Sequence, residues 1–125
     1  MKTKQVKIGY AIYKLLEQEH VELLRSPAKG LIEHDKLAIT LETDQSLPEK
    51  FQALMHELTH GVADMYDVEL DEVKTNLLAT GVAIFFVDNI PLIEELVQQV
   101  KDNRDVFPGA LGGDATKKRI SKKTK

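Results

Sequence analysis

The chain of 125 residues contains no cysteine and no tryptophan, and aromatic residues make up only 6% of it. The lack of cysteine excludes a disulfide framework, a cysteine-bound zinc site and a thiol nucleophile, and it suits a reducing compartment. The longest apolar run, Leu77 to Val87, is interrupted by Thr80 and Gly81. A membrane-spanning helix needs about 20 apolar residues. The sequence therefore predicts a protein without a membrane segment.

The N-terminal stretch MKTKQVKIGY is basic and lacks the apolar core, about 7–15 residues long, of a secretory signal. Hydrophobic residues make up 42% and charged residues 30% of the chain, which is typical of a globular domain. The length corresponds to one domain. We expect a cytoplasmic protein with one domain over residues 1–104 and a flexible basic tail over residues 105–125.

The net charge of −3 conceals an asymmetry between these two parts. Residues 1–110 carry 11 basic and 19 acidic side chains, whereas residues 111–125 carry six basic side chains and one acid, Asp114. An acidic body is a poor nucleic-acid binder, because such binding depends on neutralising phosphates. We expect no nucleic-acid partner for the body. The tail is the one segment suited to nucleic-acid binding, and the simpler interpretation is that the tail is a solvated end.

The first half of the chain favours strands. Residues 6–13 are rich in β-branched and aromatic side chains and predict a strand with Gly9 as a candidate bulge. Residues 15–24 are compatible with a short helix or an extended segment, and residues 25–30 (RSPAKG) predict a loop. Residues 31–42 predict a hairpin that turns at residues 34–36. The alternation of Leu37, Ile39 and Leu41 with small or polar residues predicts one buried face.

Three helices are predicted in the second half. Ser46 and Glu49 form a capping box, and apolar residues from Leu47 to Tyr66 follow a helical period, so the first helix should end near Asp67. A second helix, capped by Asp71 and running to about Val87, is apolar nearly all round. We therefore expect residues 77–87 to be the most buried segment.

The third helix should begin at Asn89 and Pro91, with its apolar positions facing inward, and regular structure should end after Asp102. Taken together, the order of elements predicts an α+β fold. We expect a small antiparallel β-sheet packed on about three helices.

The first helix carries the motif His56-Glu57-x-x-His60. Histidines four residues apart project from one helix face and can share one metal ion at roughly 2.0–2.1 Å. Glu57 is then placed to act as general base on a water bound to that ion. On a helical projection both histidines lie away from the apolar stripe, which is centred near Leu58 and Val62. We therefore interpret the motif as one zinc site with Glu57 as the catalytic residue.

A catalytic zinc site needs a third protein ligand, and the second helix offers Glu72 and Asn76 on one face. If the helices are antiparallel with a rise of 1.5 Å per residue, the point opposite the histidines lies nearer Asn76. Asn76 is therefore the favoured third ligand and Glu72 the alternative. A site without a third ligand is also compatible with the sequence. His34, at a hairpin turn, is expected to be solvated, and His20 is a poor ligand candidate.

With these residues in view, residues 8–89 resemble the ImmA/IrrE-type metallopeptidases, particularly small phage and prophage members. The resemblance rests on the hairpin GLIEHDKLAITLE, the helix LPEKFQALMHELTH and the segment LDEVKTNLLATGVAIFFVDN. It implies a minimal zincin-like fold, zinc bound by His56 and His60, and Glu57 as general base. Such proteins usually have glutamate as third ligand, and aligning LLATG with that pattern puts Asn76 in its place.

Two functions follow from these residues. One is a gluzincin-like zinc peptidase that cleaves a protein, which the resemblance suggests to be a transcriptional repressor. The other is an inactive pseudo-peptidase that binds a protein partner, because an amide is a weaker metal ligand than a carboxylate. Position 76 separates the two.

Overall fold

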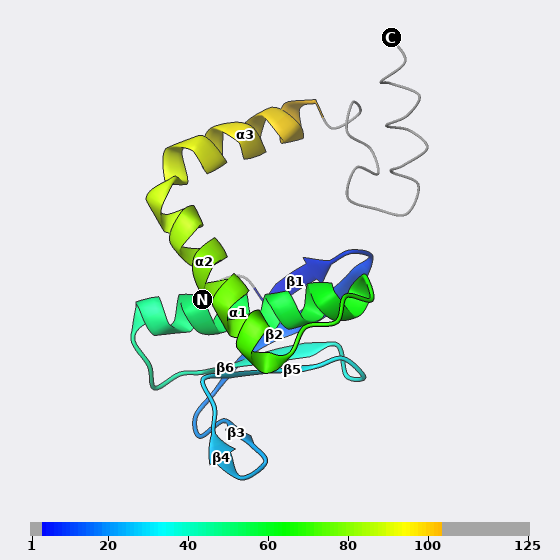
Figure 1. Ribbon diagram of the computed structural model, residues 1–125, viewed down its shortest axis with the longest axis vertical. Coiled ribbons are helices and arrows are strands. Elements are labelled where there is room, and N and C mark those ends of the chain that lie inside the picture. Colours follow the sequence, from blue (N-terminus) through cyan, green and yellow to red (C-terminus); the bar gives the residue numbers. More distant parts are fainter. Residues whose placement is uncertain (1–3, 104–125) are drawn as a thin grey trace. The chain divides into compact units, whose positions relative to one another are not determined.

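The computed structural model describes residues 4–103, and the expected basic tail, residues 105–125, lies outside them. The chain divides into two compact units at Phe85 and Phe86, and each is described by itself. The fold is α+β. Its strands are β1 Gln5–Ile8, β2 Ala11–Gln18, β3 Glu22–Leu23, β4 Ser26–Pro27, β5 Gly30–Glu33 and β6 Ala38–Glu42, and its helices are α1 Leu47–Met65, α2 Glu72–Asp88 and α3 Ile90–Asp102 (Figure 1).

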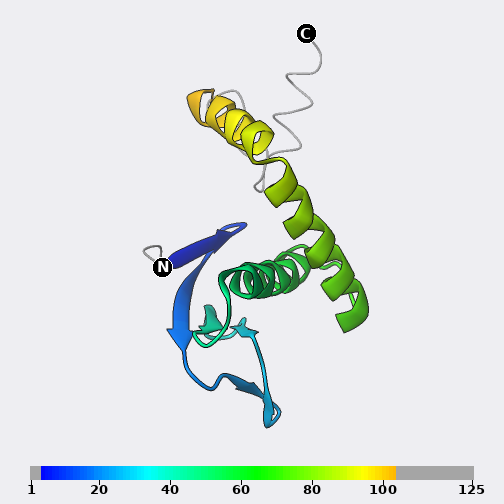
Figure 2. The ribbon, with the colours of Figure 1, turned by 90° about the vertical axis from the view of Figure 1, so that its left-hand side faces the viewer.

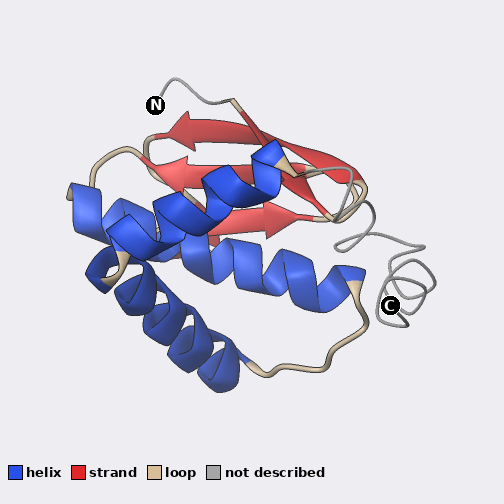
Figure 3. Ribbon diagram, turned by 90° about the horizontal axis from the view of Figure 1, so that it is seen from above, coloured by secondary structure: helices blue, strands red, loops and turns tan. Residues whose placement is uncertain are grey.

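The main sheet has the strand order β1-β2-β6-β5. The outer pairs β1–β2 and β5–β6 are antiparallel, but the central pair β2–β6 is parallel, with Lys14 opposite Ala38. The arrows in Figure 3 accordingly point in both directions. The expectation of an antiparallel sheet is therefore wrong at its centre. The β3–β4 hairpin and β5 provide the crossover that brings the chain back parallel to β2.

Residues 6–13 form a hairpin rather than the single strand that their composition predicts. Gly9 adopts a φ of 60° between β1 and β2, a conformation that glycine adopts without steric penalty. Gly9 is therefore a turn residue and not a bulge. Residues 15–24 form no helix and contain the end of β2 and all of β3, with a bend at His20, whose φ is 59°. The predicted loop at residues 25–30 contains β4. Leu24 and Arg25 at the β3–β4 turn both have positive φ, as tight hairpin turns require.

The hydrophobic core lies between the main sheet and α1. Ile39 and Leu41 of β6 are fully buried, and Tyr13 and Leu15 of β2 join them. Figure 2 shows α1 lying in the curve of the strands. The neighbours of Ile39 and Leu41 on the other face of β6, Ala38 and Thr40, are also buried. The prediction of one buried face is wrong here, because both faces of β6 are buried.

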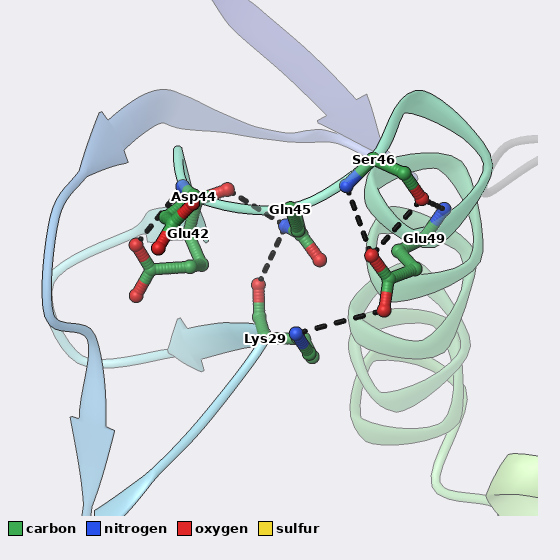
Figure 4. A network of polar contacts seen from close by, with 6 residues as sticks. All are labelled: Lys29, Glu42, Asp44, Gln45, Ser46 and Glu49. Atoms are coloured by element: carbon green, nitrogen blue, oxygen red, sulfur yellow. Dashed lines mark hydrogen bonds and ion pairs between the residues drawn. The ribbon is translucent and has the colours of Figure 1, made fainter.

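A polar network joins the sheet to the start of α1 (Figure 4). The Glu42 carboxylate accepts hydrogen bonds from the backbone N–H groups of His20, Val21 and Asp44. The Gln45 side chain donates to the carbonyls of Lys29 and Glu42. The Glu42 carboxylate satisfies the backbone N–H groups of three residues outside the strands. These bonds hold the base of the β3–β4 hairpin beside the loop that leads into α1.

Helix α1 begins as the sequence predicts. The Ser46 hydroxyl accepts from the Glu49 N–H, and the Glu49 carboxylate accepts from the Ser46 N–H, which completes the capping box. The helix ends at Tyr66, followed by Asp67 with a φ of 56°. Leu54, Leu58 and Met65 pack against the core. Val62, expected at the centre of the apolar stripe, is 48% exposed, so the packed face is rotated away from it.

The prediction that residues 77–87 are the most buried segment is wrong. Helix α2 buries only Thr75, Ala79 and Ala83, and several large apolar side chains are exposed, namely Val73, Leu77, Leu78, Ile84, Phe85, Phe86 and Val87. In α3, with N-cap Asn89 as predicted, no residue is buried. In the part of the chain that the structure describes, no single helix is long and apolar enough to cross a membrane, although α2 and α3 pass the same test when counted together.

Candidate metal centre

Helix α1 presents its motif on a face lined by small and polar residues. Its buried positions are Ala53, Glu57 and Gly61, which are four residues apart and therefore stack along one face. A Cβ on Gly61 would lie 2.5 Å from Ile8 Cδ1, so any larger residue would require the Ile8 side chain to shift. His56 and His60 flank this buried line with side chains that are 17% and 26% exposed.

His56, His60 and Glu72 bring three ligand atoms together. His56 Nε2 lies 3.1 Å from His60 Nε2, and the rings meet edge to face at a centroid separation of 4.8 Å. Glu72 Oε1 is 2.6 Å from His56 Nε2, and Glu72 Oε2 is 3.1 Å from His60 Nε2. All three ligand atoms lie within 4.8 Å of one another. This group could hold a metal ion.

The donor set is compatible with a cation as well as with hydrogen bonds among the three side chains. Two imidazole Nε2 atoms 3.1 Å apart direct lone pairs at each other unless a proton or a cation lies between them. Ligands of a tetrahedral zinc at roughly 2.0–2.1 Å are separated by about 3.3 Å. Two of the observed separations, at 3.1 Å, are slightly shorter than this, and the third, 2.6 Å between His56 Nε2 and Glu72 Oε1, is a hydrogen-bond distance. Two imidazoles and one carboxylate are also a ligand set used by catalytic zinc sites.

The favoured third ligand, Asn76, does not make the observed contact. The loop at residues 66–71 reverses the chain, so α2 runs back over α1 (Figure 1). Two contacts define the alignment of the helices: Gln52 donates to the Thr80 hydroxyl at 2.8 Å, and His60 faces Glu72. His56 also contacts Glu72, at 2.6 Å, rather than Asn76.

The contacts correspond to the alternative in which Glu72, one turn before Asn76, faces the histidines, which the helix-rise argument disfavoured. A glutamate side chain is one methylene longer than an asparagine side chain, and the two Glu72 oxygens each reach one histidine. Asn76 lines the same pocket. The contacts favour Glu72, which the sequence argument had ranked second. Asp71 positions Glu72, because its carboxylate accepts from the Lys74 N–H at 2.7 Å and caps α2.

Glu57 is a buried carboxyl directly beside the histidine pair, 8% exposed. Burial raises the pKa of Glu57 to about 7, the His56 ring opposes this shift, the Glu72 carboxylate adds to it, and a hydrogen bond from the Ile32 N–H opposes it again. A pKa near 7 suits a general base, which must accept and release a proton near neutral pH. Strongly shifted carboxyls of this kind are typical of functional sites.

Gly30 of β5 makes room for this carboxyl. A Cβ at position 30 would lie 3.2 Å from Glu57 Cγ and 3.3 Å from Leu41 Cδ2. Both distances are tight for a side-chain contact, so any larger residue would press on Glu57. The sequence gives no sign of this role, because glycine at position 30 looks like part of the predicted RSPAKG loop.

The group opens onto a pocket of about 600 Å³. Its walls come from the β3–β4 hairpin, β5, α1 and the start of α2, and it is lined by Leu23, Ala28, Lys29, Gly30, Leu31, Ile32, His34, Glu49, Gln52, Ala53, His56, Glu57, His60, Glu72 and Asn76. Strand β5 lies at the edge of the main sheet. The pocket therefore combines three metal-ligand candidates, a buried carboxyl and a sheet edge.

The His34 side chain is 38% exposed, so the expectation of a solvated histidine holds in part. It lines the pocket, and its Nδ1 lies 3.1 Å from the Tyr13 hydroxyl. His20 lies elsewhere, at a second cavity beside Glu42. The turn at residues 34–36 is present as predicted, but sequence alone did not show that this turn folds toward the motif helix.

Comparison with known proteins adds no relative: no family model, no curated protein and no solved structure matches this chain.

Proposed function

We propose that this protein is a metal-dependent peptidase, with zinc held by His56, His60 and Glu72 and with Glu57 as general base. The observation that carries the proposal is the Glu72 carboxylate, which contacts both histidines of the motif beside a buried carboxyl. A zinc ion in this group would supply Lewis acidity and lower the pKa of a bound water to about 7.

The residues of the chain have separate roles in this proposal. His56 and His60 supply neutral nitrogen ligands, and Glu72 supplies the negative charge that a cation favours over an amide. Glu57 accepts a proton from the attacking water and passes it to the leaving amine. Its burial removes competing water, and the Ile32 N–H orients it.

The pocket supports a peptide as the substrate. An extended chain can add to an open sheet edge through main-chain hydrogen bonds. Gly30, Leu31 and Ile32 of the edge strand β5 line the pocket beside the histidines. A protein segment in extended conformation is therefore the substrate class we propose. The resemblance to ImmA/IrrE-type peptidases suggests a regulatory protein, such as a transcriptional repressor, as the source of that segment.

The alternative of an inactive binding module depended on an amide as third ligand. With Glu72 in contact with both histidines, that reason no longer distinguishes the two functions, and the peptidase is the function that we favour.

Zinc content tests the ligand set. The full chain is stripped with a chelator, dialysed against zinc and analysed for bound metal. We expect about one zinc per parent chain, and loss of zinc in His56→Ala, His60→Ala and Glu72→Ala. Asn76→Ala is the matched control on α2 and should keep its zinc. Zinc loss in Asn76→Ala with retention in Glu72→Ala would show that the third ligand is Asn76.

Hydrolysis tests the general base. The zinc-loaded chain is incubated with a peptide library, and cleavage is followed by mass spectrometry. Glu57→Gln should keep zinc and lose cleavage by about 10²–10⁴-fold, the usual contribution of a general base. If the parent chain binds zinc but cleaves no peptide, the binding module becomes the favoured function.

A further inference from the structure

His34 stands at the junction of two cavities. It lies in the turn between β5 and β6 and lines the pocket that contains the three ligand candidates. It also lines a neighbouring cavity of about 520 Å³, together with His60 and Asp64 of α1 and Lys74 of α2. The imidazole therefore reaches the metal pocket from the sheet, opposite the helix that supplies the histidine pair.

Both polar contacts of His34 are made by the same ring nitrogen. Nδ1 lies 3.1 Å from the Tyr13 hydroxyl and 3.7 Å from Asp64 Oδ2. The Tyr13 ring meets the imidazole edge to face, at 86° and a centroid separation of 6.3 Å. Tyr13 is a core residue, 2% exposed. The ring is thus held through Nδ1, and Nε2 is the nitrogen that remains for the pocket.

The Tyr13 hydroxyl determines where the His34 proton resides. Burial, followed by the charge of Asp64, raises the pKa of Tyr13, so the hydroxyl stays protonated and acts as a donor. His34 Nδ1 is the acceptor that the described residues offer it. A proton on Nδ1 of a neutral imidazole would deprive the part-buried hydroxyl proton of this acceptor, which is unfavourable. Neutral His34 therefore carries its proton on Nε2.

The charged form of His34 leads to the same result. An imidazolium carries protons on both nitrogens, with Nδ1–H facing Tyr13 and Asp64. Nε2 is a hydrogen-bond donor in either state, so its role does not depend on which state is populated.

We propose that His34 is an oxyanion-binding residue of the metal pocket, whose Nε2–H donates to an anionic oxygen of a bound peptidic ligand. Tyr13 is its positioning residue. The inference rests on the proposed function, because the oxygen in question is the one that gains negative charge when a peptide carbonyl is attacked. A donor fixed in advance toward such an oxygen stabilises the developing charge.

Binding of two zinc-directed ligands tests the role without relying on turnover. A phosphonate dipeptide presents a tetrahedral oxyanion, whereas a thiol dipeptide of the same sequence binds zinc through sulfur and presents none. Titration calorimetry on the zinc-loaded full chain measures both. His34→Ala should bind the phosphonate about 10–100-fold more weakly, the usual effect of losing one hydrogen bond to a charged group, and should bind the thiol as the parent does.

Three further variants sharpen the result. His34→Gln keeps a side-chain donor and should recover part of the phosphonate affinity. Tyr13→Phe removes the hydroxyl that fixes the tautomer, so its phosphonate affinity should fall by a smaller factor than in His34→Ala. His20→Asn is the matched control, because it replaces a histidine outside the metal pocket, and it should bind both ligands as the parent does.

Each contrary outcome has a distinct meaning. Equal phosphonate binding by His34→Ala and the parent overturns the inference. Equal loss of thiol and phosphonate binding together with loss of zinc also overturns it, because His34 would then be a metal ligand. A parent chain that takes up no zinc overturns the proposed function itself, and the inference with it. Zinc analysis before each titration tells this last case from the others.

Discussion

Helices α1 and α2 each bury a line of small or polar residues spaced by four, but they differ in the burial of their large apolar residues. The buried line of α1 is Ala53, Glu57 and Gly61, and that of α2 is Thr75, Ala79 and Ala83. Large apolar side chains of α1 pack on the core, whereas Leu77 and other large apolar residues of α2 are exposed. The small residues therefore identify the contact face of a helix better than its overall hydrophobicity does.

The strongest test of this contrast replaces one leucine in each environment. Leu41 is fully buried and Leu77 is 67% exposed. Leu41→Ala should lower the free energy of unfolding by about 2–5 kcal/mol, because it leaves a cavity. Leu77→Ala should change it by less than about 0.5 kcal/mol. Urea denaturation measures both, and a large loss in Leu77→Ala would show that the exposed face of α2 is covered in solution.

Alanine substitutions at one glycine in each helix give a second comparison. A Cβ at Gly61 meets Ile8 and Ile32, at 2.5 and 3.1 Å from their Cδ1 atoms, whereas a Cβ at Gly81 has nothing within 4 Å. Gly61→Ala should destabilise the protein by about 1–3 kcal/mol through overpacking. Gly81→Ala should stabilise it by about 0.5–1 kcal/mol, because alanine favours the helix. Opposite shifts in melting temperature are expected, and shifts of the same sign would contradict the packing of α1 on β1.

The buried carboxyl of α1 predicts a pH dependence. Because the pKa of Glu57 is raised from 4.5 to about 7, the folded chain binds its proton more tightly than the unfolded chain does. This stabilises the fold at pH values below 4.5, and the contribution is lost as the pH rises to about 7. In metal-free protein, Glu57→Gln should be more stable than the parent at pH 8 by on the order of 1–2 kcal/mol.

The difference between Glu57→Gln and the parent should narrow as the pH falls toward 4.5. Thermal melts in chelator at several pH values measure it, and a constant difference would mean that Glu57 is not the group responsible.

The caps of the two helices give the smallest effect. Ser46→Ala removes the capping box of α1, and Asp71→Ala removes the acceptor for the Lys74 N–H in α2. Each should cost about 1 kcal/mol of stability. We expect only Asp71→Ala to weaken zinc binding as well, because Asp71 fixes the turn that carries Glu72. If both variants bind zinc with equal affinity, the Asp71 cap does not position Glu72.

The local features of this fold could be predicted because they depend on neighbouring residues. Ser46 and Glu49 fix the start of α1, Asp67 its end and Asp71 the start of α2, and the β5–β6 hairpin turns where its polar residues lie. The parallel β2–β6 pair and the burial of α2 could not be predicted, since both depend on contacts between residues far apart in the sequence.

The candidate site shows the same limit. His56, Glu57 and His60 follow from one helical turn, but the expected alignment of α2 placed Asn76 at the histidines, where the structure has Glu72. The choice between Glu72 and Asn76 depended on how far each side chain reaches. The helical rise per residue, which was used to align the two helices, does not include that length. The approach of His34 depended on tertiary packing of a turn, for which the sequence carries no local signal.

The parallel pairing of β2 with β6 has a consequence for how quickly the protein folds. The β1–β2 and β5–β6 hairpins join residues close in sequence, but the pairing of Lys14 with Ala38 must close a much longer loop. Loop-closure entropy rises with loop length, and non-local contacts slow folding. We therefore expect the two hairpins to form early and the central pair to complete the sheet late. Because closing this loop then limits the rate, substitutions that weaken the β2–β6 pair should slow folding.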